Sequence, residues 1–172
     1  MDLKNNRRGR ISEFANHFDG VTFTAAAPEP TVNGLWGVNV DVALPCATQN
    51  ELNGEEAKML VANKVIAVGE GANMPCAADA VNLFIENKIL YAPGKASNAG
   101  GVAVSGLEMA QNSLKYTWSR EVVDGKLKEI MSDIHTSCIK YGASKDHVNY
   151  VKGANIAGFV KVADAMLAQG VV

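Results

Sequence analysis

The chain has 172 residues, of which 48% are hydrophobic and 20% are charged, and its 16 basic and 18 acidic side chains give a formal net charge of −2. A chain of this length is expected to form one domain of ordinary size and to bury about 70% of the surface of its unfolded state. The near balance of charges argues against nucleic acid as the main partner, because phosphate binding depends on clustered Lys and Arg.

The sequence also predicts a cytoplasmic protein that does not insert into a membrane. No apolar run approaches the ~20 residues that cross a bilayer, and the polar residues 1–8 lack the apolar core of a secretory signal. The three cysteines, Cys46, Cys76 and Cys138, show no C-x-x-C spacing, so we expect reduced and mostly buried thiols. The three histidines form no metal-ligand spacing with them, and no metal site is predicted.

The first forty residues predict a short helix followed by a loop. Ile11, Phe14, Ala15 and Phe18 recur at spacings of three and four, which predicts a helix within residues 5–18. Residues 21–39 contain two prolines and two glycines, which predicts a loop with at most one short strand near residues 21–23.

Residues 40–91 alternate between short apolar runs and helical patterns. The apolar runs 40–44, 65–68 and 89–91 predict strands, and the segments 54–63 and 76–87 predict helices between them. Short apolar strands separated by helices are typical of a parallel sheet covered on both faces. The expected fold class is α/β, with a partial doubly wound (Rossmann-like) parallel sheet followed by a long-helix C-terminal region.

After residue 92 the pattern is helical. We expect a helix over 98–118, a second helix whose N-cap is Ser119 or a neighbour, and a third over 150–169, with Gly170 as the final stop. The expected buried face of the second helix is Val123, Leu127, Ile130, Ile134 and Cys138. The apolar side of the third is Ile156, Phe159, Val160, Ala163, Met166 and Leu167.

Ligands of open α/β sheets bind beyond the carboxyl ends of the strands, so the loops that follow the three strands are the candidate sites. The first loop, residues 45–51, contains Ala47, Thr48 and Gln49, and its amides and hydroxyl can hydrogen-bond a ribose or a carboxamide. The alternative is that these residues only turn the chain and cap the next helix.

The second loop, residues 69–75, has the first two glycines of a G-x-G-x-x-G fingerprint but Met74 at the third position. It is therefore a weak phosphate loop, although a backbone that closely approaches a ligand could present Asn73 to it. The alternative is a tight strand-to-helix turn with Pro75 at the start of the helix.

The third loop leads into the long helix through Gly100 and Gly101. Free N–H groups at this helix start favour an anion or a carboxylate, and Ser105 lies one turn further along. The alternative is that Ser105 packs against another helix. Gly94-Lys95 is not a Walker loop, because Ile89 stands where that motif needs a glycine.

Together these runs resemble hexameric glutamate dehydrogenase of the bacterial and fungal NADP-linked type. The matching stretches are residues 8–13, 43–52, 70–75, 92–113 and 149–170, in unbroken order. The resemblance implies that Ser105 binds a carboxylate of the substrate, that Val102 lines the substrate side-chain pocket, and that Asn73 and Asn98 lie beside the nicotinamide. It implies that the loop flanking the cofactor ribose contains Ala47, Thr48 and Gln49.

The implied activity is reversible reductive amination of 2-oxoglutarate with ammonium to L-glutamate. The implied hydride donor is NADPH, and NADH is the alternative. The family's catalytic lysine and aspartate, its substrate domain and its glycine fingerprint have no match here. The resemblance therefore implies that residues 1–97 are the second half of a dinucleotide-binding domain and that residues 98–172 are helices that pack toward a substrate domain.

We accordingly expect part of an oxidoreductase that has no turnover by itself and contains no catalytic residue. The alternative is a non-catalytic nucleotide-binding or self-assembly module. Family members are hexamers, and apolar faces on the C-terminal helices predict a homo-oligomer here too.

Overall fold

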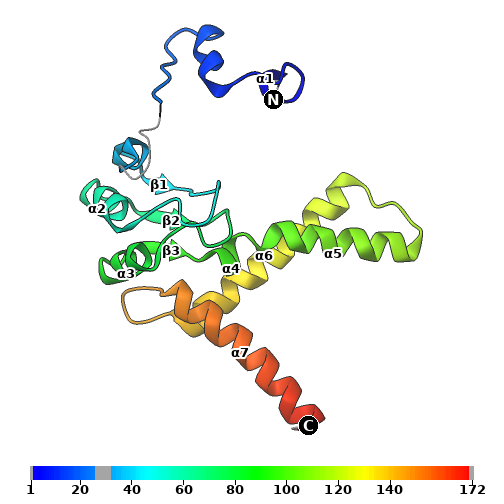
Figure 1. Cartoon of the computed structure of the whole chain (residues 1–172). Helices are drawn as coiled ribbons and strands as arrows, with labels where there is room; N and C mark the ends of the chain where they lie inside the picture. The colour runs from blue at the N-terminus through cyan, green and yellow to red at the C-terminus, as the bar shows by residue number, and fades with distance from the viewer. Residues whose placement is uncertain (1, 26–31, 171–172) are drawn as a thin grey trace. The chain divides into compact units, whose positions relative to one another are not determined.

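The structure is a computed structural model that describes residues 2–25 and 32–170 (Figure 1). The contacts divide the chain into an N-terminal unit, residues 1–35, and a C-terminal unit, residues 36–172. No helix among the described residues is long and apolar enough to cross a membrane.

The N-terminal unit differs from the predicted helix over 5–18. It contains a short helix α1 (Asp2–Asn5) and a 3-10 helix η1 (Ile11–Asn16). Arg8 adopts a left-handed conformation with φ of 52°, which interrupts the helix, and η1 then begins where the Glu13 carboxylate accepts the Arg10 N–H at 2.7 Å. The predicted apolar face is exposed, although the rings of Phe14 and Phe18 lie 4.7 Å apart.

The predicted loop over 21–39 contains one 3-10 turn, η2 (Gly34–Gly37), and no strand at residues 21–23. Its residues 26–31 lie outside the described part of the chain.

The predicted α/β fold with a parallel sheet is confirmed. Three strands, β1 (Val42–Ala43), β2 (Ala67–Gly69) and β3 (Leu90–Ala92), pair in parallel in the order β1-β2-β3. Helices α2 (Gly54–Ala62) and α3 (Ala78–Glu86) connect them. Parallel strands require such crossover connections, and the carboxyl ends of all three therefore meet at one edge of the sheet.

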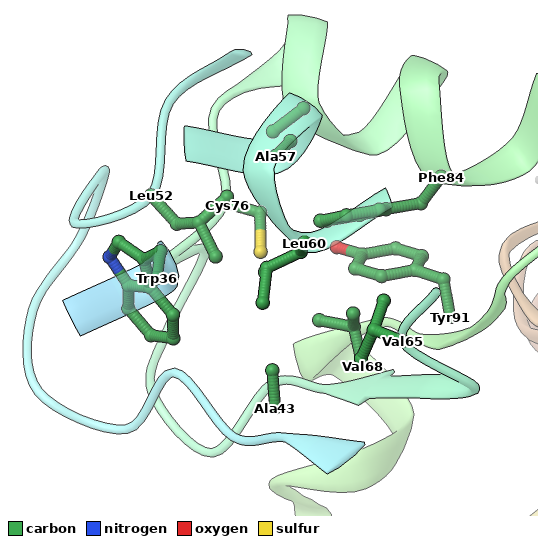
Figure 2. Packing of buried hydrophobic residues seen from close by; sticks show 11 residues of the cluster. Trp36, Ala43, Leu52, Ala57, Leu60, Val65, Val68, Cys76, Phe84 and Tyr91 are labelled. Carbon is green, nitrogen blue, oxygen red and sulfur yellow. The ribbon is translucent and has the colours of Figure 1, made fainter. Parts of the chain in front are cut away.

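The core lies between one face of this sheet and helices α2 and α3. Leu60 of α2, Val68 of β2 and Phe84 of α3 are at most 1% exposed, and Figure 2 shows these side chains converging with Tyr91 of β3. Each fully buried Leu, Val or Phe contributes about 1.5–3 kcal/mol relative to an exposed one.

The expectation that both faces of the sheet are covered is wrong for the described residues. Val42, Leu44 and Leu90 alternate with the buried positions, and their exposed fractions are 52%, 64% and 41%. Successive strand side chains point to opposite faces, so these three belong to the face that α2 and α3 do not cover.

After β3 the chain is helical, as predicted, with α4 (Gly94–Ser97), α5 (Ala99–Leu114), α6 (Arg120–Gly142) and α7 (Tyr150–Gln169). The short helix α4 was not predicted. α5 ends four residues before the predicted limit, because Lys115 adopts a left-handed conformation. The predicted N-cap Ser119 and the stop at Gly170 are confirmed.

Helices α6 and α7 pack against each other (Figure 1), and two buried glycines, Gly142 and Gly153, lie at their crossing. A Cβ atom on Gly153 would lie within van der Waals overlap of the Cys138 carbonyl, and one on Gly142 would overlap the Asn149 carbonyl. Backbone thus packs on backbone, and Cys138 is buried as predicted. The rest of the predicted α6 face is half-buried, whereas Phe159 and Leu167 of α7 are 71% and 81% exposed.

This close crossing predicts that Gly153→Ala destabilises the chain. The added methyl group must displace backbone of α6, and we expect a loss of about 1–3 kcal/mol in the free energy of unfolding. Gly158→Ala is the matched control, since a Cβ there meets nothing within 4 Å, and it should stabilise the helix by about 0.5–1 kcal/mol. Urea denaturation measures both, and equal effects of the two substitutions would contradict the close crossing.

Candidate functional site

The loops that follow β2 and β3 are joined by Glu70, the residue directly after β2. Its main-chain N–H donates to Ala92 O at 3.1 Å, and its side chain is buried, with 4% of the residue exposed. One carboxylate oxygen accepts the Cys76 N–H at 3.1 Å, and the other accepts the Gly94 N–H at 2.5 Å. One side chain therefore binds both ends of the second loop to the start of α4.

Ser97 adds a second link between the same loops. Its hydroxyl lies 2.6 Å from the main-chain oxygen of Glu70 and 3.0 Å from that of Pro93. Helix α4, which ends at Ser97, turns the chain so that Asn98 follows at the edge of the second loop. Sequence reasoning missed this turn because four residues show no helical period.

Asn73 and Asn98 lie together, as the family resemblance implies. The Asn98 Nδ2 group donates to the side-chain oxygen of Asn73 at 2.8 Å and to the main-chain oxygen of Ala72 at 3.0 Å. Within residues 2–25 and 32–170, no hydrogen bond occupies the Asn98 side-chain oxygen or the Asn73 amide nitrogen. The pair thus offers one acceptor and one donor, which match a primary carboxamide.

The first loop is packed against the second. The Gly71 N–H donates to Pro45 O at 2.9 Å, and a Cβ on Gly71 would overlap the Cys46 sulfur. The Ala47 N–H donates to the Glu51 carboxylate at 2.7 Å, while Thr48 and Gln49 are exposed.

Residues 47–50 turn the chain, as the structural alternative for the first loop expects, but one detail of each structural alternative is wrong. Thr48 and Gln49 do not cap α2, because its N-cap is Asn53, whose side-chain oxygen accepts two N–H groups of the first turn. Pro75 does not start α3, which begins at Ala78 after the N-cap Ala77.

A pocket of about 650 Å³ lies beside the Asn73–Asn98 pair. Its wall combines loop residues with the exposed edge of α3 and the start of α7. The polar side chains around it include Asn50, Glu70, Asn73, Asn82, Lys95 and Asn98. Lys95 is held by α7, since its ammonium group donates to the Asn155 side-chain oxygen at 2.7 Å.

The other predicted site residues do not line this pocket. Val102 and Ser105 lie about one and two helical turns beyond Asn98 on α5. Val102 is 73% exposed, and the Ser105 hydroxyl lies 3.4 Å from the carbonyl of Gly101 in its own helix. The alternative that Ser105 packs against another helix finds no support in the described residues, where Ser105 is exposed.

Beneath the second loop, Cys76 and Tyr91 are buried (Figure 2), and both interact with the Glu70 carboxylate. Burial and the nearby Glu70 carboxylate raise the pKa of the Cys76 thiol and the pKa of the Tyr91 hydroxyl well above their usual ranges. Both groups therefore stay protonated at neutral pH.

The described residues hold no cluster of His, Cys, Asp or Glu that could bind a metal ion. What the site offers is a hydrogen-bonded edge of three loops with a fixed pair of carboxamides.

Residues 1–170 match the Glutamate/Leucine/Phenylalanine/Valine dehydrogenase family. The chain belongs to this family.

Two relatives illustrate the likeness in sequence. The chain is 60% identical over its whole length to a glutamate dehydrogenase of Bacteroides thetaiotaomicron, and it covers 37% of that protein. It is 57% identical over 99% of its length to the NADP-specific glutamate dehydrogenase of Salmonella typhi, again covering 37%. The chain thus spans little more than a third of the length of these relatives. Others of similar identity are NAD(P)-specific or NAD-specific.

The fold agrees with a solved structure of the family. The whole chain superposes on the glutamate dehydrogenase of Plasmodium falciparum with a TM-score of 0.87 and 48% identity, and it covers 36% of that chain. The resemblance inferred from the sequence motifs is therefore confirmed.

The burial of the thiols predicts that one cysteine reacts rapidly in the folded chain. Cys46 is exposed, whereas Cys76 and Cys138 are buried and burial raises the pKa of both thiols. A raised pKa lowers the thiolate fraction, and the thiolate is the nucleophile.

We therefore expect an aromatic disulfide reagent at neutral pH to modify one thiol quickly in the native chain and all three after unfolding. Cys46→Ser should abolish the fast phase. A fast phase that persists in this variant would show that Cys76 or Cys138 is accessible in the folded chain and would contradict this expectation.

Proposed function

We propose that the chain supplies the nicotinamide end of a cofactor site and one wall of a substrate site for a glutamate dehydrogenase. The reaction is reversible reductive amination, in which 2-oxoglutarate, ammonium, NADPH and a proton give L-glutamate, NADP⁺ and water. The hydrogen-bonded pair Asn73–Asn98 carries this proposal, because its free acceptor and donor suit the carboxamide of nicotinamide. The bound dinucleotide would supply the hydride.

The residues around the pair have complementary roles in this proposal. The loop with Ala47, Thr48 and Gln49 flanks the cofactor ribose. Ser105 donates its hydroxyl to a carboxylate of 2-oxoglutarate or glutamate, and Val102 contacts the aliphatic part of the substrate. Both lie on the first turns of α5, whose N-terminal end favours a negatively charged group.

We propose NADP as the cofactor, with NAD as the alternative. The membership of the family and the NADP-specific relative support NADP. We also propose that the 172 residues alone bind the cofactor without turnover, since the lysine and aspartate that would transfer protons have no match among them.

Substitution of Asn98 tests the cofactor site. The fluorescence of NADPH titrated with the chain measures binding, and we expect Asn98→Ala to weaken it by about tenfold, corresponding to about 1.4 kcal/mol. Asn87→Ala is the matched control. It removes one asparagine hydrogen bond, to Leu83 O at 2.9 Å, at the far end of α3, and it should leave the affinity unchanged.

NADH in place of NADPH tests the choice of cofactor. If neither dinucleotide binds the unmodified chain saturably, the cofactor role is wrong. The rival function, a self-assembly module without nucleotide binding, would then stand.

We further propose that copies of the chain associate. Phe159 and Leu167 on α7 and Val102 and Met109 on α5 are between 68% and 81% exposed, and monomeric proteins rarely leave such apolar faces uncovered.

The molar mass from light scattering should therefore rise with concentration. The double substitution of Phe159 and Leu167 to Ser should lower the association. Lys161→Ser, on the same helix and also exposed, is the control that should not. A concentration-independent monomer would rule out association through these helices.

A further inference from the structure

Glu70 is a buried carboxylate that lies behind the Asn73–Asn98 pair. A buried charge is costly unless donors surround it. The donors here are main-chain N–H groups of Cys76 and Gly94, which come from two different loops. The two oxygens of one rigid group therefore set the distance between the second loop and α4.

The asparagine pair depends on that distance. Asn73 is part of the loop that Glu70 begins and Cys76 ends, whereas Asn98 is the residue after α4, which Gly94 begins. The Asn98 amide reaches Ala72 O and Asn73 Oδ1 at 3.0 and 2.8 Å, so a shift of about 1 Å between loop and helix would break both hydrogen bonds.

Gly94 shows how little free space this junction has. A Cβ at this position would lie 2.9 Å from Ala72 O, 3.1 Å from a Glu70 carboxylate oxygen and 3.4 Å from the Asn98 amide nitrogen. The loop, the carboxylate and the asparagine thus all pack on the one residue that lacks a side chain.

We propose that Glu70 is a positioning residue that fixes the geometry of the Asn73–Asn98 carboxamide pair by holding the N–H groups of Cys76 and Gly94. It acts through the main chain, since its two carboxylate oxygens accept these two N–H groups. The consequence for nicotinamide rests on the proposed function. A carboxamide cannot replace the carboxylate, because its NH₂ group would face a main-chain N–H in either orientation.

The test compares Glu70→Gln with Glu56→Gln. Glu56 is the matched control: it is also buried, with 3% exposed, and its carboxylate also accepts a main-chain N–H, that of Asn53 at 2.8 Å. This hydrogen bond belongs to the start of α2, and Glu56 is not among the residues that line the pocket.

The readout is the side-chain NH₂ signal of Asn98 in ¹H–¹⁵N NMR spectra, recorded without cofactor at temperatures where circular dichroism shows each variant folded. Glu70→Gln should accelerate exchange of these protons with water by about tenfold or more, since about 1.4 kcal/mol of protection is lost. Glu56→Gln should leave their exchange unchanged. Unchanged exchange in Glu70→Gln, or equal acceleration in both variants, overturns the proposal.

Glu70→Asp provides the same test if Glu70→Gln does not fold. It keeps the charge but shortens the side chain by one methylene group, so the carboxylate cannot reach both the Cys76 and the Gly94 N–H groups. Protected Asn98 protons in this variant would overturn the proposal. NADPH binding is measured separately on the same samples. Failure of the unmodified chain to bind NADPH contradicts the proposed function, whereas the exchange rates alone decide the role of Glu70.

Discussion

The burial of one sheet face beneath α2 and α3 is the constraint on which the rest of the C-terminal unit depends. Val68 and Tyr91 are neighbours in the parallel register and lie under Leu60 and Phe84. A slip of one residue would turn these side chains to the opposite face, so the core fixes the register. The register in turn fixes where each strand ends, and therefore where Glu70 and Pro93 leave the sheet. The positions of the loops that form the candidate site therefore follow from the packing of this core.

The helices after β3 are attached to this platform at a few points. Lys95 of α4 donates a hydrogen bond to Asn155 of α7. Lys88, which follows α3, forms an ion pair of 2.7 Å with Asp146 in the loop that joins α6 to α7. The second pair is exposed and contributes little to stability. The glycine crossing of α6 and α7 contributes more to stability, because its close backbone contact leaves the two helices no room for adjustment. Rigid packing at this crossing and a polar link at α4 place the start of α7 beside the pocket.

The strands, the parallel topology and the order of the helices could be predicted, because apolar periodicity and strand ends are properties of the local sequence. The proximity of Asn73 and Asn98 was implied by the family resemblance. The motifs around Ser105 also identified the family. Other features could not be predicted: the break at Arg8 depends on one backbone angle, and α4 is too short for a period. From the sequence, Glu70 was identified only as part of a glycine loop. Its neighbours in sequence do not indicate a buried carboxylate, because the N–H groups that it binds belong to Cys76 and Gly94, which lie 6 and 24 positions away.

The candidate site has two parts, the Asn73–Asn98 pair and the residues Ser105 and Val102 on α5. Within the described residues, the first is fixed by other protein groups and the second is exposed. The asparagine pair is held by hydrogen bonds and by a buried charge, so it needs little ordering to bind a carboxamide. Ser105 and Val102 instead face water on α5, where a hydroxyl gains little from a carboxylate that water solvates equally well. The substrate binding that we propose at α5 would therefore require a surface that covers the helix and excludes water. Such a surface would also bury the apolar residues that α5 and α7 expose.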